Sequence, residues 1–520
     1  MSKPKAFLKK SKAKKKEEQV RRSIVLDICP QIDGILNSFQ ALETADDFQA
    51  AGVDFEEAAG KWRAGDAAKS LRFFDRAIGV YSQGLQKFPG SLDLAYNKAR
   101  VLLEIATHPI LVQQLPGTPW DILQQALEAH RYALNLAQDN ADTLFNTAQV
   151  LTAIAEASAK DPDRPEQEAL QALEEALELQ SRCLAIQELK LEESIQQQNE
   201  AAAQLDSTGD QADVVEQKGS NSDDDTDDGG ASLNNNNAAD QWFAVVESVT
   251  KETLIDTILA ELGTLTTLCS ILSSSTTSTL TTRLAWIEEF SSKLVKAKLP
   301  TLLQDADAER RQEVALAKAN LVSALLETGY RSESIDASTY KRERDEAFKD
   351  PDMDLEKDFP ALLANANSLV AFNVALSDID INASSASQRW NALSAAIANL
   401  AAASKISGPV PEDIAETHMI RGNCSLLQHQ LGQPPTSYKL AITNKSQLLQ
   451  NADTFYRNAS KLYQDEDMKA ICQFRGLVAQ TLIAGSDLMS TLASWGTTKS
   501  KEWVESQIQD MIDEGLLAAG

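Results

Sequence analysis

The sequence has few aromatic residues and no continuous runs of β-branched residues, which argues against a protein built from sheets. Aromatic residues make up 6% of the 520 residues. Apolar residues recur instead at the three- and four-residue spacing of an amphipathic helix, so we expect an all-α chain. With 43% hydrophobic residues, the chain has enough apolar side chains to fold, and its length suits several domains or one long solenoid.

Cysteine is also scarce. The five cysteines are odd in number, far apart and without a Cys-x-x-Cys pair, which indicates free thiols in a reducing compartment. No apolar run approaches the roughly 18 residues of a membrane helix. The N-terminus carries charge where a signal peptide needs its apolar core. We therefore expect a cytoplasmic and/or nuclear protein with no membrane partner.

The motifs of the common catalytic and metal sites are missing. There is no phosphate-binding Gly-rich loop with Lys, no His-Glu-x-x-His helix and no Gly-x-Ser-x-Gly elbow. The four histidines are scattered and have no thiol or carboxylate partner at metal-ligand spacing: His108, His130, His418 and His429. We expect no enzyme, no cofactor, no metal and no small-molecule ligand.

Two nine-residue segments match each other in register, 94–102 and 143–151. Each places an aromatic residue, an Asn, an Ala and a Val-Leu pair on successive helical turns. This pattern predicts the first helix of a helical hairpin, in which a small residue allows the partner helix to come close. A second-helix pattern also recurs, in 65–78 and in 126–134.

These residues resemble tetratricopeptide repeats (TPRs), stacked helical hairpins of about 34 residues. Ala99 and Ala148 match the small position of the family's first helix, and Ala126 and Ala133 match those of the second. The resemblance covers roughly residues 51 to 187 and implies a TPR-like superhelix. The two first-helix alanines are 49 residues apart (148 − 99), which exceeds the family spacing. The Pro- and Gly-rich stretch 107–120 would end a helix, so we predict an inserted loop there.

Composition divides the chain into four parts. We predict a basic disordered tail (1–22), a TPR-like solenoid (23–198), an acidic and Asn-rich disordered linker (199–240) and a C-terminal region of degenerate helical repeats (241–520).

The tail has a charge opposite to that of the remaining chain. It holds ten Lys or Arg and two Glu, a net +8, so the remaining residues carry −27 − 8 = −35. Its lysine run is a candidate nuclear-import signal, formed by Lys9, Lys10, Lys12, Lys14, Lys15 and Lys16. A patch for RNA or acidic partners and a merely solvated tail are the alternatives.

The linker is strongly acidic, with nine Asp or Glu and one Lys between Leu205 and Gly230. It is consistent with an arm that shields a basic client, or with a hydrated spacer. Ser220 and Ser222 stand before acidic residues and are candidate phosphorylation sites.

The net charge of −27 argues against nucleic acid as the main partner and favours a protein, with a basic protein as one candidate. The resemblance implies a groove lined by the first helices, with candidate residues Asp93, Tyr96, Asn97, Arg100, Asp142, Phe145, Asn146 and Gln149. We therefore expect a non-catalytic adaptor, or an escort chaperone or assembly factor for a client such as a histone or ribosomal protein. The alternative is a general scaffold subunit without charge preference, and an enzyme whose site lies in the degenerate half is the weakest hypothesis. The oligomeric state is open.

Overall fold

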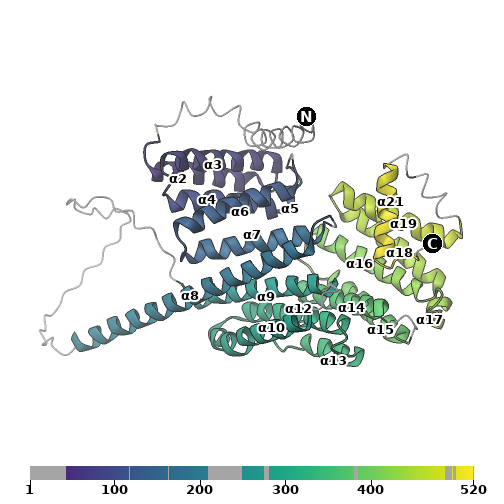
Figure 1. Ribbon diagram of the computed structural model, residues 1–520. Helices are drawn as coiled ribbons and strands as arrows, with labels where there is room; N and C mark the ends of the chain where they lie inside the picture. The colour runs from purple at the N-terminus through teal and green to yellow at the C-terminus, as the bar shows by residue number, and fades with distance from the viewer. Residues whose placement is uncertain are drawn as a thin grey trace, which may run out of the picture.

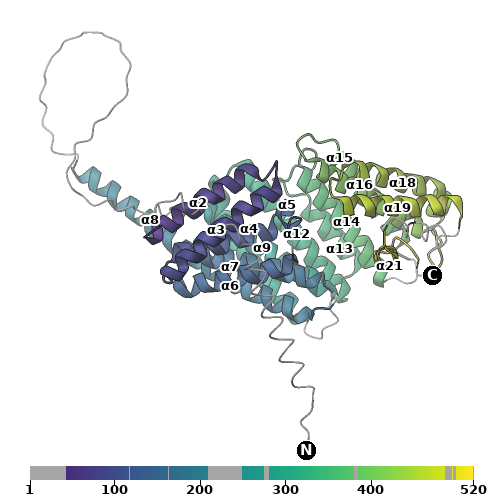
Figure 2. The same ribbon diagram turned by 90° about the horizontal axis from the view of Figure 1, so that it is seen from above.

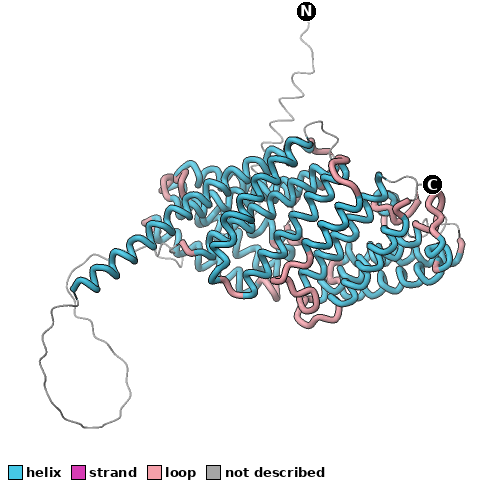
Figure 3. Tube along the Cα trace, turned by 90° about the horizontal axis from the view of Figure 1, so that it is seen from below, coloured by secondary structure: helices cyan, strands magenta, loops and turns pink. Residues whose placement is uncertain are grey.

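The computed structural model describes residues 42–115, 117–161, 163–208, 249–274, 280–379, 384–486, 495 and 499–518. Side chains are described for these residues apart from 201–208, 274, 280 and 281. Every regular element in the described ranges is a helix, so the all-α prediction is confirmed for them (Figure 3).

The N-terminal part consists of antiparallel helices that each pack on the next: α2 (Ala45–Trp62), α3 (Ala67–Lys87), α4 (Leu92–Thr107), α6 (Pro119–Leu136), α7 (Ala141–Ala159) and α8 (Glu166–Thr208). The first helices of successive hairpins, α2, α4 and α7, also contact one another. A short helix, α5 (Pro109–Val112), lies in the predicted insertion between α4 and α6. Polar side chains cap the starts of α3, α4, α6 and α7, namely Asp66, Ser91, Thr118 and Asn140.

Small residues mark the closest approaches between these helices. Ala99, Ala126, Ala133 and Ala148 are all 0% exposed. A larger side chain at any of them would push neighbouring helices apart, because the core is already filled. The predicted small positions of both helix types are thus core positions.

Helix α8 is longer than the sequence pattern predicts. We predicted the solenoid to end at residue 198, but α8 continues to Thr208. The extra residues include the Ala-rich stretch 201–203, and alanine has the highest helix propensity. The C-terminal part of α8 projects away from the other helices (Figure 1), and it leaves Leu189 and Ile195 61% and 47% exposed.

Beyond the predicted linker the helices continue in the same manner, from α9 (Lys251–Ser274), which packs on α8, to α12 (Ala308–Arg331), which packs on α9. Between these two the chain forms α10 (Leu280–Ser292), the π-helical turn η3 (Lys293–Lys298), α11 (Leu299–Leu302) and the 3₁₀ turn η4 (Leu303–Asp305). One hydrophobic cluster extends from α4 to α12, so both sides of the linker share a core.

The remaining helices extend this arrangement towards the C-terminus (Figure 2). They are α13 (Ala337–Ala347), α14 (Phe359–Ile379), α15 (Ala386–Ala403), α16 (Pro411–Gln430), α17 (Lys439–Thr443), α18 (Lys445–Leu462), α19 (Glu466–Ala484) and α21 (Lys501–Asp513). An exposed hydrogen bond of 3.3 Å from Gln113, just after α5, to Asp465, at the start of α19, joins the N-terminal hairpins to the C-terminal helices.

Two described helices are long and apolar enough to cross a membrane by length and composition, Lys251–Ser273 in α9 and Phe359–Ile379 in α14. Uninterrupted apolar runs of that length are missing from the sequence, because Thr residues interrupt α9 and Asn residues interrupt α14. Their most apolar windows are 61% and 56% buried inside the protein, as is typical of core helices.

Candidate functional site

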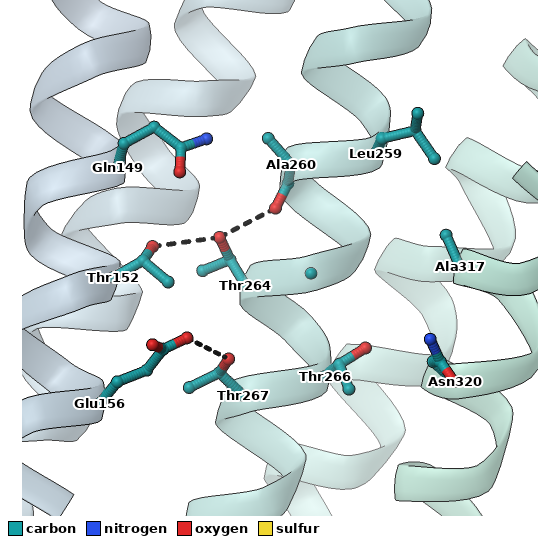
Figure 4. A pocket seen from close by; sticks show the side chains of 11 residues that line it. Gln149, Thr152, Glu156, Leu259, Ala260, Thr264, Thr266, Thr267, Ala317 and Asn320 are labelled. Carbon is teal, nitrogen blue, oxygen red and sulfur yellow. Dashed lines mark hydrogen bonds between the residues drawn. The ribbon is translucent and has the colours of Figure 1, made fainter. Parts of the chain in front are cut away.

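Two adjoining cavities lie between α7, α9 and the helices beside them. The first, of about 350 Å³, is bounded by α7, α9 and α12, and the second, of about 490 Å³, by the end of α7, the start of α8 and α9. Both are lined by Glu156, Thr266 and Thr267, so they form one continuous depression, which we call the groove. Figure 4 shows the first cavity.

Threonine hydroxyls on α7 and α9 give the groove a polar lining. Thr264 donates to the carbonyl of Ala260 at 2.9 Å, and Thr266 donates to that of Leu262 at 2.8 Å. Thr152 similarly donates to its own helix. A threonine that donates within its helix leaves its hydroxyl oxygen as an acceptor, and of Thr152 and Thr264 one can donate to the other instead.

The hydroxyl of Thr264 also joins three helices. It lies 3.2 Å from the hydroxyl of Thr152 on α7 and accepts a hydrogen bond of 3.0 Å from Gln180 on α8 (Figure 4). Further along, Thr267 of α9 donates to Glu156 of α7 at 3.4 Å. These contacts hold the two walls of the groove in a defined register.

Two amide side chains line the first cavity on either side of α9, Gln149 from α7 and Asn320 from α12 (Figure 4). Both are half-buried, and neither makes a side-chain hydrogen bond within the described residues. An amide both donates and accepts, so it can pair with the backbone of a bound segment whatever its sequence. The groove is therefore suited to an extended polypeptide.

A buried carboxyl lies behind the groove. Glu261 of α9 is 0% exposed and accepts a hydrogen bond of 3.0 Å from Ser181 of α8. Burial raises the pKa of Glu261 to about 7, because the ionised form loses its hydration. The α8–α9 contact thus contains a group that titrates near neutral pH.

The eight predicted groove residues lie in different environments. Gln149 lines the first cavity, whereas Tyr96 accepts a hydrogen bond of 2.9 Å from Asn146, and this bond joins α4 to α7. Arg100 forms ion pairs with Glu56 and Glu104. Of the remaining four, Phe145 packs against the core, Asn97 is half-buried, and Asp93 and Asp142 are exposed at helix starts.

The sequence pattern missed the α9 and α12 residues of the groove. Thr264 and Asn320 lie more than a hundred residues beyond Gln149, in segments whose resemblance to the repeat pattern is weak.

The candidate import signal and phosphorylation sites, and the His and Cys residues, lie elsewhere in the chain. The lysine run from Lys9 to Lys16 and the serines Ser220 and Ser222 lie outside the described residues. Within the described residues, no three His, Cys, Asp or Glu side chains are grouped to hold a metal ion. Four cysteines are free and buried, Cys183, Cys269, Cys424 and Cys472.

Comparison with known proteins gives short matches. No protein-family model matches the chain. A UPF0656 protein of Schizosaccharomyces pombe is 35% identical over 144 residues, which cover 27% of this chain and 31% of that protein. An uncharacterized protein of Saccharomyces cerevisiae, YNL193W, is 38% identical over 72 residues, which cover 13% of each chain. The chain therefore spans less than a third of either relative, and neither name states an activity.

Among solved structures, a circular tandem repeat protein with novel repeat topology and enhanced subunit contact surfaces aligns with 91% of this chain and 98% of its own. The sequence identity is 13% and the TM-score is 0.28, too low to support a shared fold. The description of this protein as a helical, repeat-like arrangement rests on its own helix contacts.

Proposed function

We propose that the protein is a non-catalytic interaction scaffold that binds an extended segment of a protein partner in the groove. In this proposal the hairpins form a TPR-type superhelix. Its α5 and α19 regions meet at the hydrogen bond between Gln113 and Asp465. The unpaired amides of Gln149 and Asn320, held on helices of fixed register, are the observation that carries the proposal. Such amides give affinity for a backbone rather than for one side chain.

We further propose that the partner is a basic client, such as a histone or ribosomal protein, and that this chain acts as its escort or assembly factor. The net charge of −35 outside the first 22 residues supports this by attracting a cationic segment over a distance of several ångströms. Nuclear and cytoplasmic localisation is part of the same proposal.

A general scaffold subunit without charge preference is the second candidate. It is favoured by the lining of the first cavity, where nine of the eleven residues carry a hydroxyl, an amide or an apolar side chain and Glu156 carries the carboxylate. A groove of this kind can hold a neutral segment through backbone hydrogen bonds alone.

Filling the first cavity tests whether the groove is the binding site. Gly263 lies on its wall, and a β-carbon there would meet no atom within 4 Å. A Gly263→Phe variant should therefore keep its fold while its ring occupies the cavity. Gly60→Phe is the matched control, because Gly60 lies in α2, is equally open and is remote from the groove.

Partners of the full chain would be captured from cell extract and quantified by mass spectrometry for the three proteins, after confirming equal melting temperatures. We expect the stoichiometric partner to be lost with Gly263→Phe and kept with Gly60→Phe. Retention by both variants would rule out the groove.

Salt distinguishes the two candidate functions. Raising the salt from about 0.1 M to about 1 M shortens the Debye length from roughly 10 Å to roughly 3 Å. A basic partner held by charge should leave the wild-type protein in the high-salt wash. A partner of neutral or acidic composition that stays bound would instead identify a scaffold subunit.

A further inference from the structure

The second cavity differs from the first in its chemistry. It has a volume of about 490 Å³ and lies where α7 ends and α8 begins, against the face of α9. Its lining combines three carboxylates, the two basic side chains of Lys160 and Arg164, several hydroxyls and the apolar side chain of Ile271. The carboxylates are Glu156, Asp161 and Glu166.

The hydroxyls of α9 in this cavity can only accept hydrogen bonds. Thr266 donates its proton to Leu262, and Ser270 donates its proton to the carbonyl of Thr266 at 3.0 Å. Thr267 donates to Glu156. The carboxylates, and the hydroxyls that already donate elsewhere, can only accept hydrogen bonds. They would therefore bind a ligand group that has donors and no acceptor.

Two helix ends contribute partial charges at the cavity: the first turn of α8 carries a positive one, which Glu166 offsets, and the last turn of α7 carries a negative one. Helix α7 ends at Ala159, and the last turn of a helix carries a partial negative charge from its unpaired carbonyls. Glu156 lies in that last turn, is exposed, and has no ion-pair partner among the described residues. A positive charge placed in the cavity would face both.

The cations already present do not neutralise this site fully. Arg164 is held by Asp161 at 3.0 Å and stacks over the ring of Trp120, with its guanidinium carbon 3.5 Å from the ring centroid. Lys160 is exposed at the end of α7 and forms no ion pair within the described residues. Glu156 and Glu166 thus remain for an incoming charge.

Ser158 is a second, independent sign of a missing ligand. Ser158 lines the cavity and is 3% exposed, yet its hydroxyl oxygen has no hydrogen-bond partner among the described residues. A buried hydroxyl without a partner costs about 1–3 kcal/mol relative to a paired one. A donor entering the cavity would remove that cost.

We infer that the second cavity receives the side chain of an arginine from the bound segment. The planar guanidinium has five N–H donors and no acceptor, which matches Glu156, Ser158 and the hydroxyls of Thr266 and Ser270. The aliphatic part of the side chain packs against Ile271. This inference rests on the proposed function, since it names the residue that the groove selects in its partner.

A small probe tests the cavity without the partner. The full chain would be labelled at the δ1 methyl groups of isoleucine, and the Ile271 signal assigned with an Ile271→Val variant. Nα-acetylarginine methylamide would be titrated, with the citrulline analogue as the uncharged control of nearly the same shape. We expect saturable shifts of the Ile271 signal with the arginine probe and not with citrulline.

Two variants report on the recognition itself. Glu156→Gln should weaken binding of the arginine probe about three- to fivefold, as expected for one solvent-accessible ion pair. Ser158→Ala should weaken it about threefold or more. Glu57→Gln, an exposed carboxylate on α2, should have no effect and serves as the matched control.

Several outcomes would overturn the inference: no Ile271 shift, equal shifts with citrulline, an equal response to the lysine analogue, or unchanged affinity in both variants. Failure of the groove proposal is seen separately, because the probe needs no partner. An arginine-specific shift together with partners retained by Gly263→Phe would keep the second cavity as an arginine site and reject the first cavity as the partner site.

Discussion

Gly422 of α16 lies directly against the ring of Tyr456 of α18. A β-carbon on Gly422 would come within 2.6 Å of that ring, closer than two carbon atoms can approach. The Tyr456 side chain is 0% exposed and its hydroxyl donates to Asn423 on the same helix as the glycine, at 2.8 Å. The same relationship recurs near the start of the chain, where Gly52 of α2 packs on Tyr81 of α3.

The first prediction concerns this contact. Gly422→Ala should destabilise the protein by about 1–3 kcal/mol, because the added methyl group overpacks a filled core. Urea unfolding followed by circular dichroism would measure the change. Gly60→Ala is the control: it meets no atom within 4 Å, and it should be neutral or stabilising by up to about 1 kcal/mol, since alanine favours a helix. Equal effects of the two variants would contradict the packing explanation.

The buried carboxyl of Glu261 gives a second prediction. Its pKa rises from 4.5 to about 7 on folding, so the folded protein binds the extra proton between these values and its stability falls as the pH rises through them. Glu261→Gln removes the cost of burying the ionised form. It should stabilise the protein by up to roughly 3 kcal/mol at about pH 8, and little at about pH 4.

Urea unfolding of wild type and Glu261→Gln at several pH values would test this. Glu57→Gln, an exposed carboxylate with 65% side-chain exposure, should show no such pH-dependent gain. A constant difference between wild type and Glu261→Gln across the pH range would contradict the titration of Glu261.

Two buried histidines have the opposite effect. Burial lowers the pKa of His130 and of His429 to about 4, and nearby Lys445 adds to the shift of His429. The unfolded chain binds these protons at a pKa near 6.5, so stability should fall as the pH drops from about 6.5 to about 4. Each histidine accounts for up to roughly 3 kcal/mol.

The test for the histidines is the slope of stability against pH rather than its absolute value. His130→Gln should flatten the slope between about pH 6.5 and about pH 4 by close to one proton. An unchanged slope in His130→Gln would mean that His130 is charged in the folded protein.

The fourth prediction is that the buried thiols are inert. Burial raises the pKa of Cys183 to about 11 and of Cys269, Cys424 and Cys472 to about 12. The reactive thiolate is therefore rare at neutral pH. In a Cys29→Ala background, the native protein should react slowly with a thiol-reactive disulfide reagent, and four thiols should appear at once in urea. Rapid reaction of the native protein would show that a core helix opens.

The repeat pattern of the sequence predicted features that lie within a single helical hairpin. The first hairpin turns at Asp66, where the sequence predicted a turn, and Ala99 and Ala148 are buried at their predicted positions. These features depend on neighbouring turns of one or two helices, so a short stretch of sequence contains them. In the C-terminal half, Gly422 and Tyr456 are also in close contact, but the sequence there has no repeated aromatic-Asn-Ala pattern that would predict it.

Of the eight residues that the sequence suggested for a groove, Gln149 is the one that lines the first cavity. Tyr96, Asn146 and Arg100 occur on the expected helices, yet their polar groups are used to join adjacent helices. Which side chains point into free space depends on how far each helix is rotated about its axis. That rotation follows from the packing of all neighbours, and it is invisible in a local pattern.

The sequence by itself determined that the chain is helical, where its first hairpins begin and end, and which alanines allow them to pack, because helix formation and hairpin closure depend on residues close in the chain. Only the tertiary structure decided that α9 packs on α8 in one shared core and that Asn320 and Gln149 line the same cavity. It also decided that the buried Ser158 hydroxyl has no hydrogen-bond partner among the described residues. These relationships join residues that are far apart in the sequence, and they arise from the shapes of whole helix faces fitting together at close-packed density.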